Sequence, residues 1–253
     1  GCSEGGCGAC TIVLGELVDN KIEYKAINSC ISFVPSLNGK QLIIVEDLVS
    51  QNGKLHPVQD AMVKFHGSQC GFCTPGFVMS LFSMFKNNKN LNNELITDSI
   101  SGNLCRCTGY RPIIDAAKSL NKINKNDQFS KNKNKVIQQL KKIKPKNVYI
   151  KKDDKIYFSP KNIKDLKNII KKHSNFSFLA GGTDLSLKVT KERKEIPFII
   201  DLKEINELDF IKVSKNYLEV GSATPLIKFE KEIKKHYPDF YLVLKRYGSV
   251  QIR

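Results

Sequence analysis

The spacing of apolar residues changes along the chain and separates regions of different secondary structure. Up to about residue 50 the apolar residues form short β-rich runs, which predict strands over residues 11–14, 21–27 and 41–45. From residue 56 to residue 120 they recur at helical spacing, which predicts a compact bundle of about four helices. Beyond about residue 148 helical and strand-like segments alternate, so we expect a separate α+β region there.

Helix-start signals refine this pattern. Thr74-Pro75 and Arg111-Pro112 each place proline at the start of an apolar helical stretch, and a third short helix is expected over about 92–100. In the last region we expect a helix over 163–171, followed by three strands. These strands are predicted over 176–180, 196–202 and 217–220.

The pattern divides the α+β chain into four segments. They are a β-grasp, ferredoxin-like domain (1–52), a helical bundle domain (53–120), a Lys-rich linker (121–147) and the start of a further α+β domain (148–253). Gly1 lies directly before a cysteine, and Arg253 ends the chain without a cap or tail. Both ends look cut, so we expect a fragment of a longer polypeptide.

Composition is that of a globular protein. The chain has 253 residues, 41% of them hydrophobic and 26% charged, and it contains no apolar run long enough to span a membrane. We expect no membrane association. A cytoplasmic location is expected because its reducing conditions would keep the eight cysteines available as thiolates.

The net charge of +16 raises the possibility of nucleic-acid binding. However, residues 121–155 alone carry twelve lysines and three aspartates, which is over half of the excess. Few aromatic residues lie between these lysines to stack on bases. We therefore interpret the segment as a solvated linker and expect no nucleic-acid partner.

The cysteines fall into two sets of four. Cys2, Cys7 and Cys10 have the spacing C-x4-C-x2-C, and Cys30 follows them; this is the plant-type order for a [2Fe–2S] cluster. The glycines between these cysteines allow positive φ angles and a close approach of the backbone to a cluster. A structural zinc site is the alternative, but zinc prefers paired C-x2-C motifs.

The second set combines C-x2-C (Cys70, Cys73) with C-x-C (Cys105, Cys107), a spacing that could also bind zinc. Each pair lies at the predicted N-terminus of a helix, where free N–H groups favour the negative charge of a thiolate-ligated cluster. A disulfide framework is a further alternative for eight cysteines. It is disfavoured because neighbours in a C-x-C motif cannot easily bridge each other.

Other candidate sites are weaker. The segment 179–185 is a strand end followed by Gly181-Gly182, whose backbone N–H groups could reach a phosphate, although such a turn is more often only a turn. The four histidines have no ligand spacing, and no Ser-His-Asp set or pair of catalytic carboxylates can be argued.

Several motifs together resemble a known family. The N-terminal GCSEGGCGAC, the motif QCGFCTPG at 69–76 and GNLCRCTGYRP at 102–112 resemble the iron–sulfur module of the molybdenum hydroxylases. FLAGGTDL at 178–185 and GSVQIR at 248–253 resemble the FAD domain of the family's xanthine dehydrogenase small subunits. The linker stretch 127–130 and residues 236–240 also resemble that group.

The resemblance implies two [2Fe–2S] clusters, a PCMH-type FAD domain and no catalytic residue in this chain. The cluster of the helical domain would lie nearest a molybdopterin centre on a partner large subunit, and the ferredoxin-like cluster would lie nearer FAD. The resemblance also implies FAD-binding residues, which are Leu179, Ala180, Gly181, Gly182, Thr183, Asp184, Leu185 and, at the flavin, Tyr247.

The resemblance implies an electron-transfer subunit of a xanthine dehydrogenase-like enzyme. Electrons would pass from molybdopterin through both clusters to FAD and then to NAD⁺. A subunit of an aldehyde or N-heterocycle hydroxylase is the alternative within the family, and a zinc-stabilised nucleic-acid-binding protein is the alternative outside it. The chain departs from the family pattern at Ser3, where glycine is usual, and in lacking the opening hairpin and the rest of the FAD domain.

Overall fold

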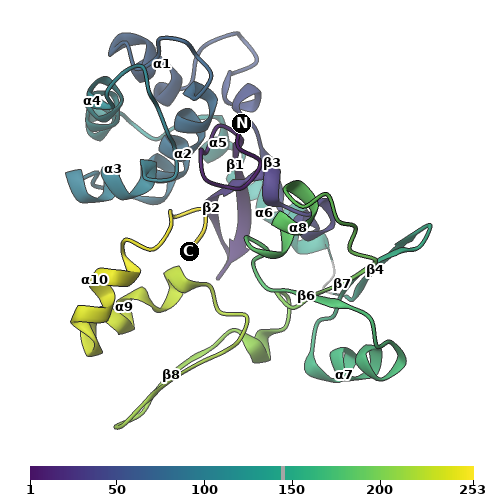
Figure 1. Ribbon diagram of the computed structural model, residues 1–253. Coiled ribbons are helices and arrows are strands. Elements are labelled where there is room, and N and C mark those ends of the chain that lie inside the picture. Colours follow the sequence, from purple (N-terminus) through teal and green to yellow (C-terminus); the bar gives the residue numbers. More distant parts are fainter. Residues whose placement is uncertain (144–145) are drawn as a thin grey trace. The chain divides into compact units, whose positions relative to one another are not determined.

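The computed structural model describes residues 1–143 and 146–253, which form two compact units (Figure 1). The first unit comprises residues 1–32, 37–143 and 249–252. The second comprises residues 33–36, the described part of 144–248, and Arg253. Each unit therefore contains a short segment that is remote from the rest of it in sequence.

The first unit contains an antiparallel sheet of three strands in the order β2-β1-β3 (Figure 1). The strands are β1 (Thr11–Val18), β2 (Lys21–Asn28) and β3 (Gln41–Ile43). Asp19 and Asn20 connect β1 to β2 with φ angles of 46° and 61°, the left-handed conformation that a two-residue hairpin requires. β3 is shorter than predicted because the Ile44 amide donates to the Asp47 carboxylate (2.9 Å) and the chain turns.

The four predicted helices are confirmed. They are α1 (Pro57–Lys64), α2 (Thr74–Asn87), α3 (Asn93–Ile100) and α4 (Arg111–Ser119). Residues 76–85 of α2 are all buried, because this helix contacts the sheet as well as α1 and α3. An all-round apolar sequence is what such a central helix requires.

Residues 121–147 differ from the predicted solvated linker. They contain α5 (Gln128–Lys131) and α6 (Lys133–Lys142), and residues 144 and 145 lie outside the described part of the chain. Four side chains from this segment pack against the core of the first unit: Phe129, Val136, Ile137 and Leu140. The prediction missed these apolar residues because many lysines lie among them. They recur at helical spacing, and a narrow apolar stripe of this kind is sufficient to pack a short helix against a core.

The second unit contains a mixed sheet in the order β4-β5-β7-β6. Its strands are β4 (Val148–Lys152), β5 (Lys155–Ser159), β6 (Ser177–Leu179) and β7 (Phe198–Asp201). β5 and β6 both pair in parallel with β7, so the carboxyl ends of these three strands share one edge. The sequence did not predict β4 and β5, because lysines occupy the exposed positions of this hairpin.

The remaining elements of the second unit surround a small apolar core. The helices are α7 (Ile163–Lys172), α8 (Leu185–Thr190), α9 (Leu226–His236) and α10 (Pro238–Leu244), and β8 (Ile211–Val213) pairs with β9 (Leu218–Val220). Ile200 and Ile205 are fully buried in the core. In the described part of the chain, no helix combines the length and apolarity needed to cross a bilayer.

Candidate functional site

The first cysteine quartet lies on the loop 1–10 and the turn after β2. The amide of Cys2 donates to Cys7 Sγ (3.4 Å), and the amide of Cys7 donates to Cys2 Sγ (3.3 Å). Cys10 and Cys30 form a second pair through a side-chain hydrogen bond. The four predicted residues are thus brought together as two pairs.

The two pairs differ in electrostatic environment. Burial acts to raise the pKa of Cys2, but the backbone N–H groups of Glu4, Cys7 and Gly6 outweigh it and lower the pKa to about 7. Burial, together with the hydrogen bond that the Cys30 thiol makes to Cys10, raises the pKa of Cys30 to about 11. The loop therefore already points N–H groups at sulfur, an arrangement that favours a bound thiolate.

Positive φ angles shape the first loop. Gly5 (76°), Gly8 (68°) and Ser3 (58°) all adopt the left-handed region. Ser3 therefore occupies a conformation that glycine adopts with less strain. The Asn28 side chain, only 2% exposed, donates to the Gly5 carbonyl (2.9 Å) and holds the loop against β2.

The second quartet also consists of two pairs. The Sγ atoms of Cys107 and Cys70 are 3.4 Å apart, and Cys73 and Cys105 share a side-chain hydrogen bond. Cys73 is the residue that precedes the first turn of α2, and Cys107 lies four residues before α4. The predicted position at a helix N-terminus is therefore confirmed for Cys73, whereas Cys105 and Cys107 lie in the loop before α4.

Two residues that the sequence analysis missed position Cys105. The Tyr110 hydroxyl accepts a hydrogen bond from the Cys105 amide (3.0 Å), and the Thr108 hydroxyl lies 3.1 Å from Cys105 Sγ. Tyr110 has a φ of 66°, in the left-handed region, and its hydroxyl reaches back to the backbone five residues earlier. Thr108 and Tyr110 follow Cys105 by three and five residues, and this closeness in sequence was the one signal that could have identified them as contacts of Cys105.

The thiols of the second quartet alternate in acidity. The backbone N–H of Phe72 lowers the pKa of Cys70, and the hydrogen bond to Cys70 raises the pKa of Cys107. Burial raises the pKa of Cys73 to about 11. Burial also acts to raise the pKa of Cys105, but hydrogen bonds led by that from Thr108 outweigh it and lower the pKa. Each pair thus combines a more acidic and a less acidic thiol.

This donor set fits a two-iron cluster, in which each iron takes two thiolates. All eight cysteines are free thiols, so no disulfide competes for them. Within residues 1–143 and 146–253, no three His, Cys, Asp or Glu side chains meet closely enough to hold a single metal ion.

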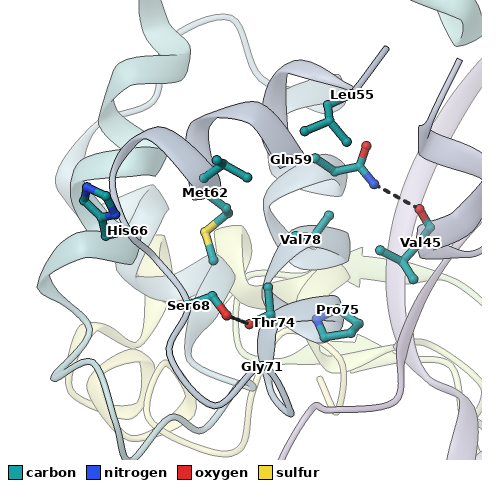
Figure 2. Close-up of a pocket in the computed structure, with 11 residues that line it drawn as sticks. Val45, Leu55, Gln59, Met62, His66, Ser68, Gly71, Thr74, Pro75 and Val78 are labelled. Carbon is teal, nitrogen blue, oxygen red and sulfur yellow. Dashed lines mark hydrogen bonds between the residues drawn. The ribbon is translucent and has the colours of Figure 1, made fainter. Parts of the chain in front are cut away.

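A cavity of about 450 Å³ lies beside the second quartet, between α1 and the turn that leads into α2 (Figure 2). Met62 and Val78 line it, together with Gly71 of the C-x2-C turn. The Thr74 hydroxyl donates to Ser68 Oγ (2.7 Å) across the start of α2, so the turn carrying Cys70 and Cys73 is tied at its base.

The predicted flavin segment runs from the end of β6 to the start of α8. Gly181 and Gly182 have φ angles of 83° and 85°, which side chains rarely adopt. A Cβ atom on Gly182 would lie 2.7 Å from Leu179 Cδ1, whereas one on Gly181 would meet nothing within 4 Å. The loop therefore has open space over Gly181, at the carboxyl edge of the parallel strands, where α/β sheets bind ligands.

The other members of the predicted flavin set differ in exposure. Ala180 and Asp184 are exposed, Thr183 and Leu185 are half-buried, and Leu179 is buried. Tyr247 follows α10, and its ring is 60% exposed. No hydrogen bond or ring contact joins it to residues 179–185 in the described part of the chain.

Two family models match the chain. A [2Fe-2S] binding domain matches residues 44–118, and the FAD binding domain in molybdopterin dehydrogenase matches residues 149–253. The two models divide the chain at the segment that contains α5 and α6.

Curated relatives match about half of the chain. Xanthine dehydrogenase of Blastobotrys adeninivorans is 54% identical over 120 residues, which is 46% of this chain and 8% of the relative. Aldehyde oxidase 1 of Oryctolagus cuniculus is 47% identical over 121 residues, 47% of this chain and 9% of that protein. The chain thus spans less than a tenth of these relatives.

Two solved structures are similar to part of the chain. Quinoline 2-oxidoreductase from Pseudomonas putida 86 shares 32% identity over 56% of this chain and 74% of that chain, with a TM-score of 0.41. Aldehyde oxidoreductase from Desulfovibrio gigas shares 36% identity over 48% of this chain and 13% of that one, also with a TM-score of 0.41. By its two domain matches and the identity of its curated relatives, this chain belongs to the molybdenum hydroxylase family of oxidoreductases, with iron–sulfur and FAD cofactors.

Proposed function

We propose that this chain relays electrons between a molybdopterin centre, held by a partner subunit or by another part of the same polypeptide, and NAD⁺. The route within the chain would use two [2Fe–2S] clusters and FAD. The observation that carries this proposal is the sorting of all eight cysteines into two quartets, each made of two close pairs.

The chain's own residues would bind and orient the cofactors. Cys2 and Cys7 would hold one iron of the ferredoxin-like cluster, and Cys10 and Cys30 the other. In the helical domain, the corresponding iron-binding pairs would be Cys70 with Cys107 and Cys73 with Cys105. When bound, iron–sulfur clusters supply one-electron transfer and FAD exchanges two electrons, which is the chemistry a relay needs.

Backbone groups would tune both sites. The N–H groups that lower the pKa of Cys2 would also hydrogen-bond its sulfur in the bound state and stabilise added negative charge. The N-termini of α2 and α4 would act on the second quartet in the same direction. The FAD pyrophosphate would lie against the exposed Gly181 and the buried Gly182 beside it, where backbone N–H groups and the Thr183 hydroxyl could donate.

Xanthine is the substrate class that we favour for the whole enzyme. Support comes from the 54% identity to a xanthine dehydrogenase and from the presence of iron–sulfur and FAD regions on one chain. Aldehyde oxidases at 46–47% identity support the alternative that the enzyme oxidises aldehydes or N-heterocycles.

Metal analysis tests the relay directly. The full-length protein, purified anaerobically, should contain about four irons and four acid-labile sulfides per chain, because each [2Fe–2S] cluster contributes two of each. Reduction should give two electron paramagnetic resonance (EPR) signals. Stoichiometric zinc in a colourless protein without sulfide would instead support the zinc-stabilised alternative and refute the relay.

A further inference from the structure

The two cysteine quartets are joined by a direct backbone hydrogen bond. The amide of Leu104 donates to the carbonyl of Cys7 at 2.9 Å. Cys7 belongs to the first quartet, and Leu104 is bonded covalently to Cys105 of the second. One hydrogen bond therefore connects a residue of the ferredoxin-like quartet to the neighbour of a residue in the helical quartet.

Asn103 secures this contact from inside the first unit. Its side chain is buried, at 1% exposure, and its Nδ2 donates to the Gly8 carbonyl (3.0 Å) and to Thr11 Oγ1 (3.2 Å). Its Oδ1 accepts from the Ser80 hydroxyl of α2 (2.6 Å). Gln251 Nε2 reaches both Ser80 Oγ (3.1 Å) and Asn103 Oδ1 (3.4 Å).

Glycines make the close approach of the loops possible. A Cβ atom on Gly8 would lie 2.0 Å from the Gly102 carbonyl oxygen, and one on Gly76 would lie 2.1 Å from the Gly8 carbonyl oxygen. Both obstacles are backbone atoms, which cannot rotate away as a flexible side chain can. The backbone segments at Gly8, Gly76 and Gly102 therefore lie too close together to accommodate a side chain on Gly8 or Gly76.

We propose that Asn103 is a positioning residue that sets the separation of the two cysteine quartets. It holds the backbone of the first loop, through Gly8, against the start of the second cysteine pair and against α2. This role rests on the proposed function, because a fixed separation matters only when both quartets carry redox centres. A network that locks the groups around a site is what a fixed geometry of this kind requires.

The sharpest variant is Asn103→Asp, which preserves size and the acceptor for Ser80. It removes the Nδ2 donor and places an oxygen opposite the Gly8 carbonyl, so the first loop loses its tie and is repelled. Asn121→Asp is the control at an exposed asparagine. Asn121 Nδ2 donates to the Leu91 carbonyl and its Oδ1 accepts from the Leu91 amide, at 2.8 Å each, away from both cysteine loops.

The first measurement is independent of cluster content. Hydrogen exchange of the Leu104 amide, measured in the full-length protein, should be about fivefold to tenfold faster in Asn103→Asp, since a net hydrogen bond contributes a factor of that order. The Asn121→Asp protein should exchange this amide at the wild-type rate. Ser80→Ala, which removes one bond of the network and little volume, should give a smaller change in the same direction.

The second measurement uses the loaded protein. With both clusters reduced, the magnetic interaction seen in the EPR spectrum should change in Asn103→Asp and Ser80→Ala at normal iron content, and should be unchanged in Asn121→Asp.

Normal Leu104 exchange and an unchanged magnetic interaction in both network variants would overturn the positioning role. If Asn103→Asp does not fold, Ser80→Ala decides between the two results. A wild-type protein without iron would refute the proposed function instead, and the exchange measurement would still judge the network.

Discussion

At the scale of single residues, each cysteine has a defined partner, and that partner determines what its loss should do. Cys105 pairs with Cys73, and its backbone and sulfur are held by Tyr110 and Thr108. These contacts belong to the second quartet only. The first quartet contacts the loop before Cys105 through the hydrogen bond between the Leu104 amide and the Cys7 carbonyl. These are backbone atoms, so replacing the Cys105 sulfur by oxygen does not alter them.

We therefore expect Cys105→Ser to remove or alter one of two EPR signals and to leave the other. The reason is that serine replaces a thiolate ligand of one cluster only. Iron content should fall toward half. Two unchanged signals would contradict the assignment of Cys105 to a cluster.

Asp127 stabilises the fold through a buried ion pair. Its side chain is 6% exposed and lies 2.7 Å from Lys86 Nζ and 2.9 Å from His56 Nε2. Asp127→Ala would leave Lys86 buried without its counter-charge, which costs roughly 3–5 kcal/mol of unfolding free energy. Asp60→Ala, which removes the exposed pair with Lys64, should cost under about 1 kcal/mol. Chemical denaturation of both variants measures the difference.

The same residue predicts sensitivity to acid. Burial acts to raise the pKa of Asp127, but hydrogen bonds from His56, Lys86 and the Ser130 amide outweigh it and hold the pKa well below its usual range. A carboxyl group with a lowered pKa stabilises the fold above its unfolded value of 3.8 and loses this contribution as the pH falls below it. The wild type should therefore lose stability more steeply than Asp127→Ala below about pH 4. Parallel denaturation curves for the two proteins would contradict the ion pair.

At the scale of elements, the sequence predicted what depends on local periodicity and missed what depends on a few apolar residues among many charges. The starts of α2 and α4 could be predicted because Thr74-Pro75 and Arg111-Pro112 are local signals. The hairpin β4–β5 and helix α6 could not, because their lysines face solvent and their order comes from contacts distant in sequence. The cysteine sets were visible as spacing, whereas the pairing within each set needed the folded loops.

Substitutions in helix α6 test whether the Lys-rich segment is a solvated linker or is packed against the core of the first unit. Leu140→Ala should lower the unfolding free energy by about 1–2 kcal/mol, because a partly buried leucine loses its packing against the core. Lys133→Gln and Lys141→Gln, on the exposed side, should change it by less than about 0.5 kcal/mol. If Leu140→Ala and the wild type had equal unfolding free energies, the segment would be better described as a solvated linker.

The loop between β6 and α8 gives a prediction about flavin. Gly182→Val should lower the FAD content of the full-length protein, because the new side chain meets Leu179 and cannot easily adopt a φ of 85°. Gly39→Val is the matched control. It carries similar backbone strain, at a φ of 77°, in an open turn of the first unit. Normal flavin content in Gly182→Val would exclude the loop as a phosphate site.

At the scale of the whole molecule, the distribution of charge matters more than its sum. The excess of +16 is concentrated in residues 121–155, where several lysines lie on the exposed side of short helices and strands. Asp127, which pairs with Lys86 of α2, shows that a charged residue of this region also stabilises the fold.

We expect no specific nucleic-acid binding at physiological salt. A protein that used these lysines on phosphates would bind DNA with an affinity that falls steeply as salt rises. Fluorescence anisotropy with a labelled duplex measures this. Tight, salt-sensitive binding that disappears when the exposed lysines are neutralised would contradict our interpretation.

The contact between Cys70 and Cys107 bears on how such a protein must be matured. Both thiols face solvent, and their sulfur atoms are 3.4 Å apart. In air, oxygen can oxidise two thiols so placed to a disulfide, taking up their two protons and two electrons. Because a cystine offers no thiolate to iron, insertion of the metal has to come before this oxidation.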